Sequence, residues 1–391
     1  MIFYQIFNTR QLTILNICCL FLFPILDVVK FLLLLLHCIF NLTFTQPILF
    51  IMRFAEIRLF LVFLLTATCL SPLLSAAEKV DYTPHIHGTV RTRFEVATES
   101  GKYRFQVRNA RVSLDGKIAP TIDYYINTDL CDRGSMKILD VWARIYATKE
   151  LGFQAGQFRM PFGVDPFRGP NTYYFANRSF IGKQVCNVRA VGVKAMYTFS
   201  TLPLSAEAGV FNPTTIGDHS GWNSSLAFAA KVTYSIGNVK LATGFQSIIP
   251  DSVRTNLIDG AVTWSAGRWT VEGEYMYKHY TAQRHKPCHA YNVFANYQMP
   301  IKAGVFNRLS FQGRFDGMTA HSNAIRNDEG QLITNDPARN RITIGATISY
   351  IKSKNLFLDI RANYEKYFYH HDVTTTPDTG DKALVELVLR F

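Results

Sequence analysis

The sequence predicts an all-β protein, a transmembrane antiparallel β-barrel of about 16 strands, from three observations. Apolar and polar side chains alternate along most of residues 78–391. The segments between these runs are alternately short and long. The last run, ALVELVLRF at 383–391, is apolar at every second position up to its final residue, Phe391. A terminus that ends as a complete strand is typical of a closed sheet, in which the last strand pairs with the first.

The N-terminal part has the composition of an export signal rather than of a folded domain. Residues 52–77 contain two arginines, an apolar stretch and small residues before Glu78, which is the layout of a secretory signal peptide. In residues 1–51, charged residues divide the apolar run into pieces shorter than the roughly 20 residues that a membrane helix needs. We therefore expect translation to start at Met52, residues 1–51 to be a non-native extension, and residues 78–391 to form the barrel.

Period-two alternation predicts the strands one by one. In residues 268–280, for example, Trp269 and Tyr275 fall on one face, and Glu272 and Glu274 fall on the other. The runs of this kind predict strands at 85–97, 102–117, 121–131, 137–147, 151–159, 188–199, 203–211, 224–236, 238–248, 255–265, 268–280, 287–299, 307–319, 339–351, 355–369 and 381–391.

The connections favour a membrane barrel over the alternative, a soluble β-sandwich. Every long connection is odd-numbered, namely 160–187, 212–223, 320–338 and 370–380, whereas the even-numbered ones are tight turns apart from 300–306. Long loops at one rim and short turns at the other are the arrangement of outer-membrane barrels. The export signal and strands of about 9 to 13 residues, close to the length that crosses a bilayer, agree with this interpretation.

Basic residues are expected on the inner wall of this barrel. The strand at 102–117 changes its alternation at Arg108 and Asn109, which predicts a β-bulge, and it places Arg104 and Arg111 toward the lumen. A positive stripe on a pore wall favours anions, although such arginines could instead balance carboxylates elsewhere on the wall. Both interpretations remain open from the sequence.

The long third outer connection is rich in aromatic residues and proline, which suits a structured segment folded into the barrel. Arg159, Arg168, Arg178 and Lys183 are then expected to border a constriction. The alternative is a loop that only covers the outer rim.

Charge and the remaining motifs narrow the function. The chain has a formal net charge of +12, and since an exported chain seldom meets nucleic acid, an anionic surface or solute is the expected partner. His85 and His87 share a strand face and could bind a metal, but histidines at the start of a strand more often face water. A disulfide between Cys131 and Cys186 is a second open alternative. No catalytic set of residues is apparent, and we expect no enzyme activity and no cofactor.

The sequence resembles the phosphate-selective porins O and P, particularly those of Bacteroidota. The resembling stretches are FQVRNARVSLDGKI at 105–118, ILDVWARI at 138–145, FQAGQFRMPFG at 153–163 and FANRSFIG at 175–182. The resemblance implies a homotrimeric outer-membrane porin, a water-filled channel for passive diffusion of small solutes with a preference for anions. The anion-pathway residues that it implies are Arg104, Arg108, Arg111, Arg159, Arg168, Arg178, Lys183 and Arg314. The fifth outer connection, PDSVRT at 250–255, lacks the lysines that mark phosphate-selective members, so phosphate specificity stays open.

The expected partners follow from the same resemblance: outer-membrane lipid and lipopolysaccharide, small anionic solutes, and the barrel-insertion machinery, which would read Leu387, Leu389 and Phe391. Three other functions would each require different features. A barrel enzyme would need a Ser-His pair on its lipid side, and a TonB-dependent transporter would need a plug domain before the first strand; the sequence has neither in the mature region. A structural or adhesive barrel without selective transport remains as the alternative.

Overall fold

The computed structural model describes residues 80–391, apart from 133, 187–188 and 214–220. The predicted translation start at Met52 and the predicted signal peptide at 52–77 lie outside the described residues. In the described part of the chain, none of the helices has the length and apolar character needed to cross a membrane.

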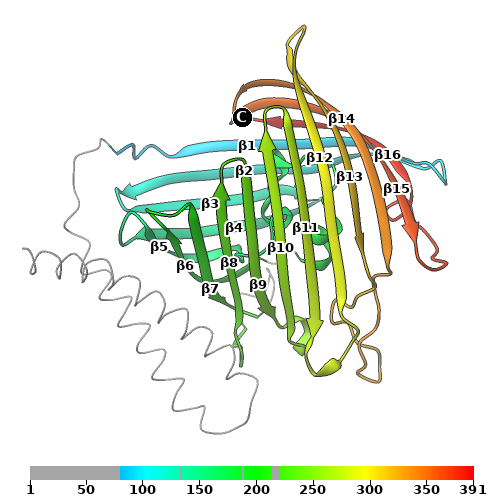
Figure 1. Cartoon of the computed structure of the whole chain (residues 1–391), viewed down its shortest axis with the longest axis horizontal. Helices are drawn as coiled ribbons and strands as arrows, with labels where there is room; N and C mark the ends of the chain where they lie inside the picture. Colours follow the sequence, from blue (N-terminus) through cyan, green and yellow to red (C-terminus); the bar gives the residue numbers. More distant parts are fainter. Residues whose placement is uncertain (1–79, 133, 187–188, 214–220) are drawn as a thin grey trace, which may run out of the picture. The chain divides into compact units, whose positions relative to one another are not determined.

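Sixteen antiparallel strands form a closed barrel in sequence order (Figure 1). The strands are β1 (His85–Ala97), β2 (Tyr103–Ala119), β3 (Ile122–Asp132), β4 (Ser135–Tyr146), β5 (Leu151–Arg159), β6 (Arg189–Thr198), β7 (Leu204–Phe211), β8 (Ala227–Ile236), β9 (Val239–Ile248), β10 (Thr255–Ala266), β11 (Trp269–Tyr280), β12 (Cys288–Ala303), β13 (Phe306–Met318), β14 (Arg339–Ser353), β15 (Leu356–Tyr369) and β16 (Lys382–Arg390). The predicted fold class is confirmed, and each strand lies where the alternation predicts it, within a few residues at its ends.

Pairing of β16 with β1 closes the barrel. The ladder runs from Thr89 opposite Arg390 to Ala97 opposite Lys382. Beyond it, Gly88 and Phe391 exchange two backbone hydrogen bonds, of 2.6 and 3.1 Å. A Cβ atom at Gly88 would lie 2.3 Å from the Phe391 ring, so the terminal aromatic ring covers a position where only glycine fits. The pairing leaves no free edge strand.

The connections follow the predicted parity. The four longest are loop L3 (160–188), the connection 212–226, loop L7 (319–338) and loop L8 (370–381), and all join strands at the same rim. One prediction was wrong: the turn at 300–306 is only residues 304–305, because β12 continues through Pro300 to Ala303 across a register shift. Proline cannot donate to the ladder and interrupts the apolar alternation, which made the strand look shorter than it is.

The bulge in β2 is also confirmed. Arg91 of β1 lies opposite Asn109, but the next residue, Thr92, lies opposite Val107. Arg108 is therefore the extra residue of the bulge.

The barrel wall is apolar outside and polar inside. In β10, Ile258 and Val262 are about half exposed, whereas Leu257 and Asp259 between and beside them are buried. Aromatic side chains gather near both rims of the outer face: Trp269 packs on Tyr297 near the short turns, and Tyr291 packs on Phe315 toward the long loops. Two aromatic girdles around an apolar band are the outer surface of a barrel that spans a membrane.

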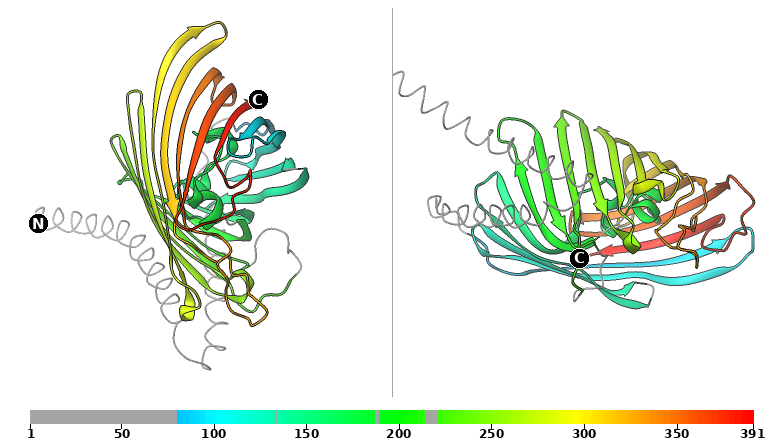
Figure 2. Two further views of the ribbon diagram at one scale, coloured as in Figure 1. Left: turned by 90° about the vertical axis from the view of Figure 1, so that its right-hand side faces the viewer. Right: turned by 90° about the horizontal axis from the view of Figure 1, so that it is seen from below.

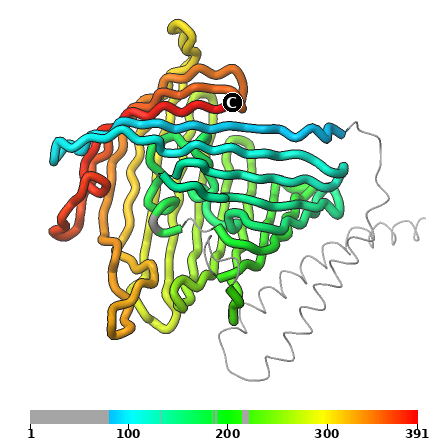
Figure 3. Tube along the Cα trace, turned by 180° about the vertical axis from the view of Figure 1, so that it is seen from behind, coloured from blue at the N-terminus to red at the C-terminus, as the bar shows by residue number. Residues whose placement is uncertain are grey.

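Loop L3 lies inside the barrel, within the ring of strands (Figures 2 and 3). It contains three short helices, η2 (Asp165–Phe167), η3 (Pro170–Thr172) and η4 (Ile181–Val185); η5 (Pro250–Ser252) and η6 (Thr281–Gln283) lie in other loops. An apolar cluster joins L3 to the wall, with Met160, Phe162, Phe180 and Ile181 from L3 and Phe211, Leu257, Met276 and Met318 from strands. Each large apolar side chain buried in this way contributes about 1.5–3 kcal/mol, so L3 is a fixed part of the lumen.

Candidate functional site

Arginines of the inner wall hold one side of L3 by its backbone. Carbonyl groups cannot be left unpaired in a buried segment, and residues 173–178 of L3 turn theirs toward β1 and β13–β15. The donors and acceptors are Arg91 to Ala176 at 2.7 Å, Arg93 to Ala176 at 3.0 Å, Arg361 to Tyr173 at 2.8 Å, Arg314 to Asn177 at 2.8 Å and Arg341 to Arg178 at 2.7 Å. This part of the wall therefore positions the loop.

The same arginines are neutralised by buried carboxylates. Glu386 of β16 accepts hydrogen bonds from Arg91, Arg93 and Arg361 at 2.6–3.1 Å. Arg341 binds Asp316 at 2.8 Å and Glu365 at 3.3 Å in the same manner. Removing one partner from a buried network of this kind costs about 3–5 kcal/mol, because the remaining charge stays buried and unpaired.

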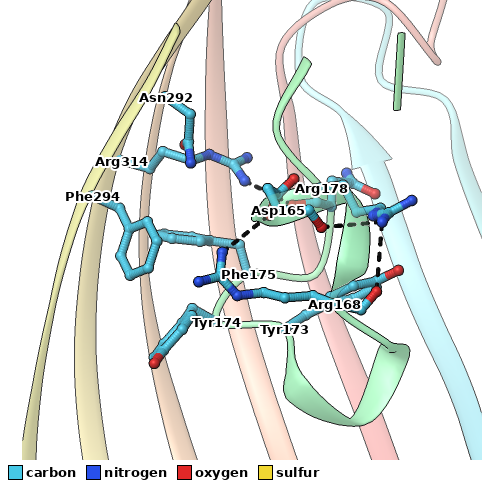
Figure 4. A pocket seen from close by; sticks show the side chains of 10 residues that line it. Asp165, Arg168, Tyr173, Tyr174, Phe175, Arg178, Asn292, Phe294 and Arg314 are labelled. Carbon is cyan, nitrogen blue, oxygen red and sulfur yellow. Dashed lines mark hydrogen bonds and ion pairs between the residues drawn. The ribbon is translucent and has the colours of Figure 1, made fainter. Parts of the chain in front are cut away.

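The beginning of L3 is held by groups of opposite character. The backbone N–H groups of Val164 and Asp165 donate to the Glu274 carboxylate of β11 at 2.6 and 3.0 Å, and Arg168 forms a two-pronged ion pair with Glu272. Acidic side chains thus hold the N–H groups of the loop, and arginines hold its carbonyl groups. Figure 4 shows Phe294 and Arg314 of the wall facing this part of the loop, in a small pocket that Arg168 also lines.

The three predicted arginines of β2 lie along the inner wall, and each is paired with a carboxylate from another strand. The pairs are Arg104 with Glu95 at 2.5 Å, Arg108 with Asp132 at 2.7 Å and Arg111 with Asp129 at 2.9 Å. Both interpretations of the sequence therefore apply: the arginines form a stripe on the wall, and each also balances a carboxylate.

Exposure shows which part of the wall water reaches. The side chains of Arg108, Arg111 and Arg144, on β2 and β4, are 21%, 15% and 25% exposed. Those of Arg91 and Arg361, beneath L3, are each 3% exposed. Water-accessible arginines therefore line the wall of β2–β4, next to β1, whose arginines lie beneath L3.

In several pairs the cation is the partner that faces water. The Arg111 side chain is 15% exposed and that of Asp129 0%; for Arg104 and Glu95 the values are 43% and 7%. In these pairs the carboxylate is buried and the guanidinium group is the partner that reaches the water of the lumen. An ion in the lumen therefore meets positive groups first.

A cluster of arginines surrounds Tyr173 of L3. The guanidinium groups of Arg91 and Arg178 lie 5.1 and 5.5 Å from the centre of its ring. Burial opposes ionisation of the phenol, but the charges of Arg178, Arg159, Arg91 and Arg111 outweigh it and lower the pKa of Tyr173. This side of L3 is strongly electropositive.

Arg159 and Arg178 are the members of this cluster that form no salt bridge with a described carboxylate, although Arg178 lies near enough to Asp165 for its charge to lower the pKa of that carboxyl. Nη1 of Arg159 is buried and has no hydrogen-bond partner among the described residues. Arg178 donates to the backbone carbonyls of Asp165 and Pro166 at 3.1 and 2.5 Å. The nearby Asp165 carboxylate instead accepts from Ser179 at 2.6 Å and from Arg168 at 3.3 Å.

The remaining predicted site residues have different surroundings. Lys183 lies in η4 and is exposed, whereas Arg314 is buried and forms an ion pair with Asp316 at 3.3 Å. The sequence did not single out Arg341 or Arg189, which binds Asp140 at 2.9 Å. The signal for Arg341 was present, since it follows Arg339 by two residues and so falls on the same inner face.

The structure also bears on the disulfide and the metal site that the sequence suggested as alternatives. Cys131 on β3 and the buried Cys288 have free thiols, and Cys186 is buried in the apolar cluster with Cys288. His87 binds Asp115 at 2.9 Å, and His85 lies 3.6 Å from the same carboxylate. Within the described residues, no group of three or more His, Cys, Asp or Glu side chains is placed to hold a metal ion.

A 16-stranded antiparallel barrel with an apolar outer band, long loops at one rim and a loop folded into its lumen has the architecture of outer-membrane porins. Residues 80–244 match the family model of the phosphate-selective porins O and P, which confirms the resemblance seen in the sequence. The chain is thus a protein of the bacterial outer membrane, and the family model that it matches and its fold are those of channels rather than of enzymes.

Solved structures share the fold at low sequence identity. An anion-selective porin from Comamonas acidovorans is 12% identical, with a TM-score of 0.53, over 79% of this chain and 98% of that one. The channel DcaP of Acinetobacter baumannii is 12% identical, with a TM-score of 0.53, over 82% and 100%. In-vitro folded OmpT of Vibrio cholerae, in a trimer form, is 12% identical, with a TM-score of 0.54, over 79% and 99%. No curated protein matches the chain in sequence.

Proposed function

We propose that this porin is a passive-diffusion channel that prefers small anions, and that its path runs between loop L3 and the wall of β2–β4. The observation that carries the proposal is the arginine cluster around Tyr173, in which Arg159 and Arg178 have no ion pair with a described carboxylate. A fixed positive charge beside a narrow aqueous path lowers the electrostatic cost for an anion to enter and raises it for a cation.

The water-accessible arginines of β2 and β4 extend this field along the path. Arg104 lies toward the outer rim, Arg111 lies deeper in the wall, and Arg144 lies near the short turns. Each forms an ion pair, so each contributes less than an unpaired charge. The predicted anion-pathway residues Arg168 and Arg314 have a different role in this proposal: they hold L3 in place and shape the path from behind.

Conductance in planar bilayers tests the channel itself. Purified protein should produce stepwise current increases in KCl that scale with salt concentration, as a water-filled path requires. Protein that inserts, as judged by heat-modifiable migration on gels, but conducts no current would support a structural or adhesive barrel instead. The proposal names small anions as a class, because the same arginines suit chloride, phosphate and carboxylates.

The oligomer and the export signal are also proposals. One solved structure of this fold is described as a trimer, and we infer a homotrimer for this chain; light scattering of detergent-solubilised protein should give three times the mass of one chain, and a monomer mass would reject it. N-terminal sequencing of protein from outer membranes should begin at Glu78, and any sequence from residues 1–77 would reject the predicted cleavage.

A further inference from the structure

Loop L7 is anchored to the inner wall by a fully buried histidine. The His321 side chain is 0% exposed. Its Nδ1 atom lies 3.3 Å from Nζ of Lys278 on β11, and its Nε2 atom lies 3.2 Å from a carboxylate oxygen of Asp336 at the other end of the loop. The backbones of His321 and Asp336 also exchange two hydrogen bonds, of 3.1 and 3.3 Å. This one side chain therefore ties both arms of L7 to the barrel.

The partners of the imidazole define its protonation state. An ammonium group can only donate a hydrogen bond, so Nδ1 facing Lys278 must be unprotonated and accept. A carboxylate can only accept, so Nε2 facing Asp336 must carry the proton. The observed arrangement thus requires neutral imidazole, with its hydrogen on Nε2.

A second proton has no acceptor here. The titratable and charged groups facing His321 are Lys278 and Tyr280 of β11, Cys288 of β12, Arg339 of β14, Asp336 of L7 itself, and His285, which packs on Tyr280 from the neighbouring loop. Asp336 is the one carboxylate among them, and it already binds Arg339. Imidazolium at this position would place two cations 3.3 Å apart in a buried site, which is strongly unfavourable.

The pH direction follows from the same contacts. Burial lowers the pKa of His321, the hydrogen bond to Asp336 raises it, and Lys278 lowers it again, so that the net pKa lies below the ordinary value of 6.5. A released loop, in which the histidine is solvated, therefore binds more protons than the anchored loop. The stability of the anchored loop is complete above about pH 6.5 and falls as the pH drops below that value.

The anchor also reaches loop L3. Asp336 holds the guanidinium of Arg339, which lies 4.7 Å from the centre of the Phe180 ring in L3. On the other side, Lys278 donates to the carbonyl of Ser322 at 3.0 Å. Loss of the histidine contact therefore loosens L7 directly, whereas L3 keeps its own hydrogen bonds to β1, β11 and β13.

We propose that His321 is a pH-sensitive latch: its protonation in acid releases loop L7 from the inner wall, and the released loop then closes the channel for brief periods. The released loop of about 20 residues is long enough to fluctuate across the outer mouth. This gating requires an open pore and is independent of whether the pore prefers anions.

Hydrogen exchange of the membrane-inserted protein tests the latch, with L7 as the reporter. Between pH 7.5 and 4.5, the exchange of residues 319–338, corrected for intrinsic rates, should rise about tenfold per pH unit below the transition, and brief current closures should appear in bilayers. In His321→Gln, whose amide can accept from Lys278 and donate to Asp336 without titrating, both effects should disappear. His371→Gln, at an exposed position of L8, should behave as wild type.

Two results would overturn the latch: exchange of wild-type L7 that does not change with pH, or acid release that persists in His321→Gln. If His321→Gln fails to assemble, Lys278→Met supplies the second test. Without the ammonium group, the repulsion between two cations is gone while burial of the imidazole remains, so acid release of L7 should be weaker than in the wild type. Acid release in Lys278→Met equal to that of the wild type would equally reject the proposal.

Discussion

Arg159 and Arg178 differ from the other arginines of the lumen in what their guanidinium groups bind. Arg91, Arg341 and Arg361 are held in buried networks with Glu386, Asp316 and Glu365. Arg159 and Arg178 lie beside Tyr173 without an ion pair to a described carboxylate. In the proposed path, the field that selects ions therefore depends mainly on these two side chains, although many more arginines line the wall.

Replacing Arg159 or Arg178 with glutamine should weaken anion preference. A unit charge about 4 Å from a hydrated ion is worth about 1 kcal/mol, which is roughly a fivefold change in a permeability ratio. Reversal potentials in a KCl gradient measure this change. Arg268→Gln, in the exposed turn between β10 and β11, is the matched control. Variants with the reversal potential of the wild type would remove Arg159 and Arg178 from the ion path.

Gly88 of β1 and Phe391, the last residue of the chain, are in contact where the barrel closes. The Phe391 ring covers Gly88, and their backbones exchange two hydrogen bonds. Phe391→Asp should reduce the amount of assembled barrel several-fold, because a charge replaces the outward aromatic ring at the closing seam. Surface protease protection of intact cells reports assembly, and Phe391→Tyr keeps the ring as the control. Undiminished assembly of Phe391→Asp would show that the terminal ring has no such role.

Loop L3 is the element that shapes the lumen, and its two halves are held by opposite charges. The Glu274 carboxylate of β11 binds the N–H groups of Val164 and Asp165, and arginines of β1 and β13–β15 bind carbonyl groups of residues 173–178. The loop is therefore fixed against strands on different sides of the barrel, which leaves the proposed path along β2–β4.

Arg341→Gln should loosen L3. The change leaves Asp316 and Glu365 buried with one fewer cation and removes the hydrogen bond to the Arg178 carbonyl, at a cost of about 3–5 kcal/mol. We expect a lower temperature of heat modification and a larger, noisier single-channel conductance. Arg308→Gln is the control, since Arg308 is a third exposed and lies 3.9 Å from its carboxylate partner. Equal conductance and stability in both variants would mean that the wall arginines do not hold the loop.

Acid should act on L3 at a much lower pH than on L7. Burial opposes ionisation of the Asp165 carboxyl, but Arg178 and Arg168 outweigh it, so its pKa lies below the ordinary value of 3.8. The contribution of this carboxylate is complete above about pH 3.8 and is lost only as the pH falls through its lowered pKa. Hydrogen exchange of residues 163–168 should therefore stay constant from pH 7.5 to 4.5. An increase over that interval, parallel to that of L7, would contradict the separate roles of the two loops.

For the whole molecule, the sequence predicted the barrel well and the site less completely. Period-two alternation is a local signal, so the strands, their number and the parity of the loops could be derived from it. The ion pairs could not, because Arg111 meets Asp129 only through the register of two strands. The position of L3 was harder still. Its contacts depend on backbone carbonyls, for which the side-chain pattern has no signal.

The sign of the reversal potential of the wild-type protein in a KCl gradient tests the central claim most directly. Chloride and potassium have nearly equal mobility in water, so the potential reports the charge of the narrow path rather than diffusion. We predict a potential displaced toward the chloride equilibrium value, with a smaller displacement at high salt as screening grows. A potential displaced toward the potassium value, or one near zero at low salt, would contradict the account of an anion-preferring path.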